Sequence, residues 1–133
     1  MTKEEVIIVA VQWWSDKLMS GKPHSNGDNS PASVFACMFA DIMAKSISKE
    51  QISIFEKELT GILNAEYDTQ LFRYGFKSIY IGCDYAPCNL LYTAANKAGI
   101  NPNNFPYKTH MQIARNSVSV ADGYGKPYAM LEA

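Results

Sequence analysis

Three side chains that could do chemistry lie close together at His24, Asn26 and Asp28. An imidazole, an amide and a carboxylate in one short segment could bind a polar ligand or help to hold a metal ion. The surrounding residues 20–30, SGKPHSNGDNS, are typical of a loop. In the alternative interpretation, which we favour, Asn26-Gly27 turns the chain and Asp28 helps to cap the next helix.

A second group, Cys83-Asp84-Tyr85, lies where a predicted strand ends and a predicted helix begins. Free N–H groups at a helix start attract anions, and they lower the pKa of a nearby thiol. Cys83 could then act as a nucleophile with His110 as its base. The alternation of Ile79, Ile81 and Cys83 favours a buried thiol instead, so we keep only Asp84 and His110 as candidate ligand-binding residues.

Aromatic rings and cations are mixed in the C-terminal third of the chain, as in Phe105-Pro106-Tyr107-Lys108-Thr109-His110. Rings stack on a nucleobase and cations hold its phosphates, so the pattern suits a nucleotide-like ligand. In the alternative, the rings pack the loop onto the sheet and the cations lie on the surface. The candidate ligand-binding residues are Phe105, Tyr107, Lys108, His110, Arg115, Tyr124, Asp84, His24 and Asp28.

The sequence lacks several common motifs of phosphate-binding, cofactor-binding, nucleophilic and zinc sites. The chain has no phosphate-binding glycine loop, no dinucleotide fingerprint and no nucleophile elbow. It has two histidines, and Cys83 and Cys88 are too far apart for the usual zinc pair. We therefore expect no cofactor and no metal. The alternative is a small acid–base or metal-dependent hydrolase that uses His24, Asp28 and His110.

Helix signals fill the first half of the chain. A capping box at Thr2-Lys3-Glu4-Glu5 predicts one helix, and a second box at Ser48-Lys49-Glu50-Gln51 predicts another. Between them, Ser30-Pro31 predicts a helix start. The apolar positions that follow these starts recur at helical spacing: Ile7, Val11, Trp14 and Leu18; Phe35, Met38, Phe39, Ile42 and Met43; Ile52, Phe55, Leu59 and Ile62.

Strand signals appear in the second half. Residues 77–83 (KSIYIGC) alternate, Pro87 opens a helix that Gly99 ends, and two short strands follow around Met111 and Val118. Arg115-Asn116 could join these strands as a tight hairpin, because Asn tolerates positive φ. We expect one α+β domain over residues 1–133, with three N-terminal helices and then strand–helix–strand–strand forming a small sheet.

The adjacent residues Trp13 and Trp14 indicate that the chain forms an oligomer. Side chains of neighbouring helical residues point about 100° apart, so both rings are buried only if the helix is surrounded or shared. We expect at least one in the core, and the other as an interface anchor of a homodimer or higher homo-oligomer.

Composition excludes several classes of protein. The 133 residues are 47% hydrophobic with a net charge of −1, which argues against a disordered chain, a basic nucleic-acid module and an acidic DNA mimic. We expect neither a membrane span nor direct sequence-specific DNA binding. Three cysteines and a start without signal-peptide features indicate the cytoplasm.

The chain also resembles short phage- and prophage-encoded accessory proteins. The residues that carry the resemblance are Gln12-Trp13-Trp14 with Lys17-Leu18, Asn26-Gly27-Asp28, Phe105-Pro106 with Lys108-Thr109, and Gly123-Tyr124-Gly125. The resemblance implies a host-defence inhibitor, of which anti-CRISPR proteins are one kind, acting in the host cytoplasm. Such a protein would sequester a nucleotide-like signal or occupy a host defence protein, without catalysis.

Overall fold

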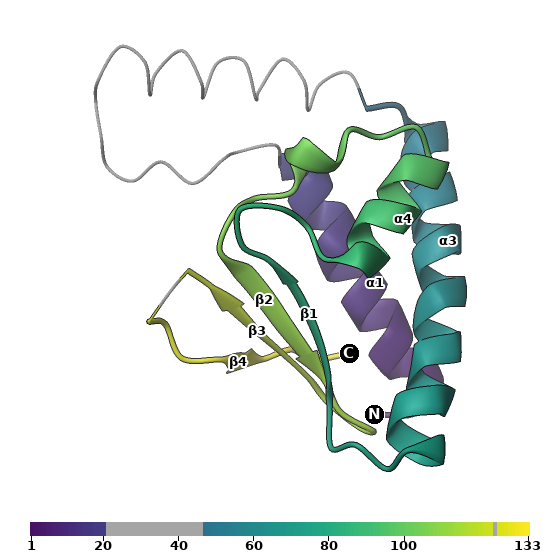
Figure 1. Ribbon diagram of the computed structural model, residues 1–133, viewed down its shortest axis with the longest axis vertical. Helices are drawn as coiled ribbons and strands as arrows, with labels where there is room; N and C mark the ends of the chain where they lie inside the picture. The colour runs from purple at the N-terminus through teal and green to yellow at the C-terminus, as the bar shows by residue number, and fades with distance from the viewer. Residues whose placement is uncertain (21–46, 124) are drawn as a thin grey trace.

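Helices lie on one side of an antiparallel sheet in the computed structural model, which describes residues 1–20, 47–123 and 125–133 (Figure 1). The α-helices in these ranges are α1 (Lys3–Ser20), α3 (Lys49–Glu66) and α4 (Asn89–Lys97). The strands are β1 (Ile79–Cys83), β2 (Thr109–Ile113), β3 (Val118–Asp122) and β4 (Ala129–Met130), in the sheet order β1-β2-β3-β4. The predicted α+β class is confirmed. The helix predicted after Ser30-Pro31 lies outside the described residues.

Both predicted capping boxes are confirmed. At the start of α1, the Glu5 backbone N–H donates to Thr2 Oγ1 at 3.2 Å. At the start of α3, the Gln51 N–H donates to Ser48 Oγ at 3.1 Å, and the Ser48 N–H donates to the Gln51 side chain at 2.9 Å. Each cap satisfies N–H groups that a helix start otherwise leaves without partners, which stabilises the helix by about 1 kcal/mol.

The short helix α4 differs from its prediction at one end. It begins at Asn89 with Cys88 as its N-cap, so the predicted opening at Pro87 is wrong. Pro87 instead forms an isolated β-bridge with Cys83, which keeps it extended. The predicted end is confirmed: Gly99 has φ +70°, and the Ile100 N–H donates to the Ala95 carbonyl at 2.9 Å.

The sequence analysis missed three further elements. Helix α3 runs on into a π-helical segment, η1 (Tyr67–Arg73), which Gly75 at φ +70° terminates. The C-terminal tail contributes the short strand β4, which pairs with β3. A 3-10 turn, η2 (Pro102–Asn104), precedes β2.

The sheet has one buried face. Ile79, Ile81, Met111 and Ile113 are each at most 2% exposed, as the alternation predicts. The β2–β3 hairpin closes around Arg115-Asn116, with the Ala114 N–H donating to the Ser117 carbonyl at 2.9 Å. We expected this turn because asparagine tolerates a positive φ, and that reason is wrong. In the described ranges the non-glycine residue with positive φ is Lys108, not Asn116.

Aromatic rings join the two halves of the core. Trp14 of α1 meets Phe105 edge to face with ring centroids 5.9 Å apart, and Phe105 lies 5.8 Å from Phe55 of α3.

No α-helix in the described ranges combines the length and the apolar character that a membrane crossing needs.

Candidate functional site

Ionisable side chains are concentrated at one end of the sheet, where β1 and β3 end and β2 begins. Asp84 follows β1, Lys108 precedes β2, and Asp122 is the last residue of β3. The register pairs Thr109 with both Cys83 and Asp122, so these strand ends are adjacent. Figure 1 shows the C-terminal end of α1 at the same end of the molecule. We call Lys17, Asp84, Lys108, His110 and Asp122 the strand-end cluster.

One half of the cluster is an imidazole–carboxylate pair. His110 Nε2 lies 2.7 Å from Asp84 Oδ1. The His110 side chain is 11% exposed and that of Asp84 is 55% exposed, so the pair lies at the boundary between the fold and solvent. Because a carboxylate holds an imidazole in one orientation, Asp84 fixes the direction of the His110 ring.

Tyr80 covers the same histidine. Its ring stacks on His110 with centroids 5.7 Å apart and an interplanar angle of 28°. Gly82, the register partner of His110, makes room for this arrangement, because a Cβ there would lie 2.8 Å from the Tyr80 hydroxyl. Partial burial raises the pKa of Tyr80, and the Asp84 carboxylate adds to the rise. The hydroxyl is therefore a hydrogen-bond donor at neutral pH.

The other half of the cluster is an ion pair. Lys17 Nζ, in the last turns of α1, lies 2.9 Å from Asp122 Oδ2, and both side chains are partly exposed. The same ammonium lies 5.0 Å from the centroid of the Trp13 ring. The sequence analysis singled out neither Lys17 nor Asp122 as a site residue, since single charges on an expected helix and strand give no signal of their meeting.

Lys108 joins the two halves through its backbone. Its N–H donates to the Asp84 carbonyl at 3.2 Å, and its carbonyl accepts from the Gly123 N–H at 2.8 Å. Held between these partners, Lys108 has φ +62°, in the left-handed region that a side chain disfavours. Backbone strain of this kind is concentrated at ligand-binding and catalytic sites.

The structure places three of the predicted ligand-binding residues at these strand ends. Asp84, Lys108 and His110 belong to the cluster, and the exposed Tyr107 precedes Lys108 in the chain. The other candidates separate from it. His24, Asp28 and Tyr124 lie outside the described residues.

Two of the predicted candidates are wrong as members of this site. Phe105 is 2% exposed and packs between Trp14 and Phe55, so it cannot stack on a ligand. Arg115 lies five residues beyond His110, roughly 16 Å away along an extended strand. Its guanidinium instead donates to the Leu71 carbonyl at 2.7 Å, at the opposite end of the sheet.

The thiol beside the cluster is inert. Cys83 is fully buried, as its alternation predicts, and burial raises its pKa to about 12, with the nearby Cys88 and Asp84 adding to the rise. A buried neutral thiol is a poor nucleophile. Among the described residues, no group of three or more His, Cys, Asp or Glu side chains is placed to hold a metal ion.

The two tryptophans have different environments. Trp14 is fully buried, which confirms the prediction that at least one of the two rings lies in the core and leaves Trp13 as the candidate interface anchor. Trp13 is half-buried and lines a mainly apolar groove of about 340 Å³ between α1 and the C-terminal tail, together with Ile8 and Leu131. Self-association through Trp13 stays a prediction.

Comparison with known proteins does not assign the chain. No protein-family model matches it, and no curated protein matches its sequence.

Proposed function

We propose that the chain is a non-enzymatic binding protein that sequesters a nucleotide-like small molecule at the strand-end cluster. The observation that carries the proposal is that two pairs of ionisable side chains, Lys17–Asp122 and His110–Asp84, lie at the same strand ends and flank the strained backbone of Lys108.

The chemistry of the cluster matches the parts of a nucleotide. Lys17 and Lys108 supply ammonium groups at these strand ends, and an ammonium group is a donor that suits phosphate oxygens. Carboxylates such as Asp84 accept hydrogen bonds from the exocyclic amine of a base or from ribose hydroxyls. The half-exposed ring of Tyr80 offers a surface on which a planar base can stack.

The biological role in this proposal follows the resemblance to phage-encoded accessory proteins. Binding in the host cytoplasm would remove a nucleotide signal on which a defence response depends. A homodimer formed through the Trp13 groove would present two such sites.

Titration calorimetry with a panel of mononucleotides, cyclic nucleotides and dinucleotides tests the proposal. We expect at least one of them to bind, and Lys108→Gln to weaken its binding by about ten- to a hundredfold, since a charge-assisted hydrogen bond contributes about 1.5–3 kcal/mol. The exposed Lys57→Gln on α3 is the matched control. If no nucleotide binds, occupation of a host defence protein replaces sequestration as the function.

A second candidate function is hydrolysis, because the 2.7 Å contact between His110 and Asp84 is the geometry of an oriented general base. In that case nucleotides incubated with the protein would be converted to products, detected by chromatography. Asp84→Asn and His110→Ala would both abolish the turnover, whereas binding without product formation supports sequestration.

A further inference from the structure

Exposed aromatic rings gather at the other end of the sheet, where η1 ends and β2 turns into β3. Phe72, Tyr74 and Phe76 are 58%, 61% and 55% exposed. Rings of this size are usually buried, and several together on a surface indicate an interaction site. With the cations among and beside them they form what we call the hairpin-end surface: Phe72, Arg73, Tyr74, Phe76, Lys77 and Arg115.

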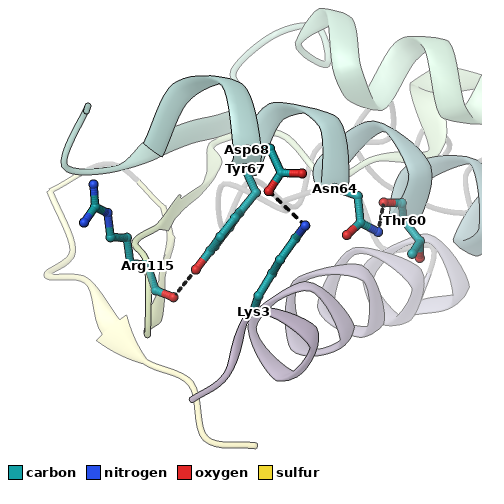
Figure 2. A network of polar contacts seen from close by, with 6 residues as sticks. All are labelled: Lys3, Thr60, Asn64, Tyr67, Asp68 and Arg115. Carbon is teal, nitrogen blue, oxygen red and sulfur yellow. Dashed lines mark hydrogen bonds and ion pairs between the residues drawn. The ribbon is translucent and has the colours of Figure 1, made fainter. Parts of the chain in front are cut away.

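The surface is held in place before any partner arrives. The Arg115 guanidinium lies 4.8 Å from the Phe72 ring centroid and donates to the Leu71 carbonyl. The Tyr67 hydroxyl donates to the Arg115 carbonyl, which fixes the hairpin against η1 (Figure 2). Lys3 of α1 forms an ion pair with Asp68 at 2.9 Å, which ties α1 to the same segment.

A pocket opens between the residues that follow η1 and the turn that joins β2 to β3. It has a volume of about 290 Å³ and is lined by Gly75, Phe76, Lys77, Ala114, Arg115 and Asn116. The lining includes two cations and no carboxylate. π-Helical segments such as η1 are frequent at functional sites, and here the segment leads directly into the exposed rings.

We propose that the hairpin-end surface docks an acidic protein segment that inserts one bulky apolar side chain into this pocket. Aromatic rings beside arginine are typical of the energetic centres of protein interfaces. Arg73, Lys77 and Arg115 complement carboxylates that flank the inserted side chain.

Single-stranded nucleic acid fits this surface less well. Base stacking needs open ring faces, but Arg115 lies over Phe72, and the Tyr74 and Phe76 rings are inclined to one another by 47°. The surface lies at the opposite end of the sheet from the strand-end cluster, so this proposal does not depend on nucleotide binding there (Figure 1).

Selection from a displayed library of random twelve-residue peptides tests the proposal on the whole chain. We expect enriched peptides in which Asp or Glu flanks Trp, Phe or Leu. Their affinity should fall at least tenfold in Phe76→Ala and in Lys77→Glu. Tyr92→Ala and Lys57→Glu remove an exposed ring and reverse an exposed charge on α4 and α3, and should leave the affinity unchanged.

Three outcomes would overturn the proposal: no enrichment, enrichment of peptides without acidic residues, or equal loss of affinity in the control variants. Tighter binding of a labelled oligothymidylate, lost in the same two hairpin-end variants, would assign the surface to nucleic acid instead. Circular dichroism of each variant separates loss of binding from loss of folding.

Discussion

We expect the strained backbone of Lys108 to lower the free energy of unfolding, and its side chain to contribute to nucleotide binding. Its backbone has φ +62°, held there by hydrogen bonds to Asp84 and Gly123. Lys108→Gly removes the strain and the side chain together, whereas Lys108→Ala removes the side chain alone. The difference between the two variants therefore reports the backbone strain, reduced by the larger chain entropy that glycine loses on folding.

The size of the difference follows from two opposing effects. A left-handed conformation costs a residue with a Cβ roughly 1–2 kcal/mol. Glycine recovers that cost but loses about 0.5–1 kcal/mol more chain entropy on folding than alanine does. We expect Lys108→Gly to be more stable than Lys108→Ala by about 1 kcal/mol, or roughly 4 °C in Tm for a chain of this length.

Urea unfolding followed by circular dichroism measures the stability, and titration calorimetry measures nucleotide binding. Both variants should lose most of the binding, because both lack the ammonium group. A Lys108→Gly variant that is less stable than Lys108→Ala would refute stored strain at Lys108, because the entropy loss of glycine would then be offset by nothing. Unchanged binding in either variant would refute a role for its side chain.

Further predictions concern the core, the buried thiol and assembly. Phe105→Ala should destabilise the fold by about 3–5 kcal/mol, whereas Tyr107→Ala should cost less than about 1 kcal/mol in the same urea assay. Burial raises the pKa of Cys83 from 9.0 to about 12. As the pH rises, the thiol therefore loses its proton in the unfolded state before it does so in the folded state. The free energy of unfolding should fall between pH 9 and pH 12, and Cys83→Ala should make this fall smaller. If the chain self-associates through its apolar groove, Trp13→Ala should shift the mass seen by light scattering toward the monomer; an unchanged mass would exclude that interface.

Local signals predicted much of the fold. The capping boxes at Thr2 and Ser48 are confirmed because their hydrogen bonds join residues three apart in the chain. The Gly99 terminus is also local. The continuation of α3 into η1 and the pairing of β4 were missed, because a π-helical hydrogen-bond pattern and a two-residue strand leave no periodicity to detect.

The candidate site was predicted only in part, because its contacts join residues that are far apart in the sequence. Asp84 and His110 were found as single residues, but their 2.7 Å contact depends on the register of β1 with β2. The ion pair between Lys17 and Asp122 joins residues 105 apart. Phe105 was misassigned because a ring beside a cation looks the same in sequence whether it faces a ligand or the core.

Backbone amide chemical shifts, followed by NMR while a nucleotide panel is titrated into the full chain, test the central claim most directly. We predict that one nucleotide shifts the amides of residues 80–84, 107–110 and 122–123 together, with little change elsewhere. Shifts centred on residues 72–77 and 114–116, or no shifts with any nucleotide, would contradict ligand binding at the strand-end cluster.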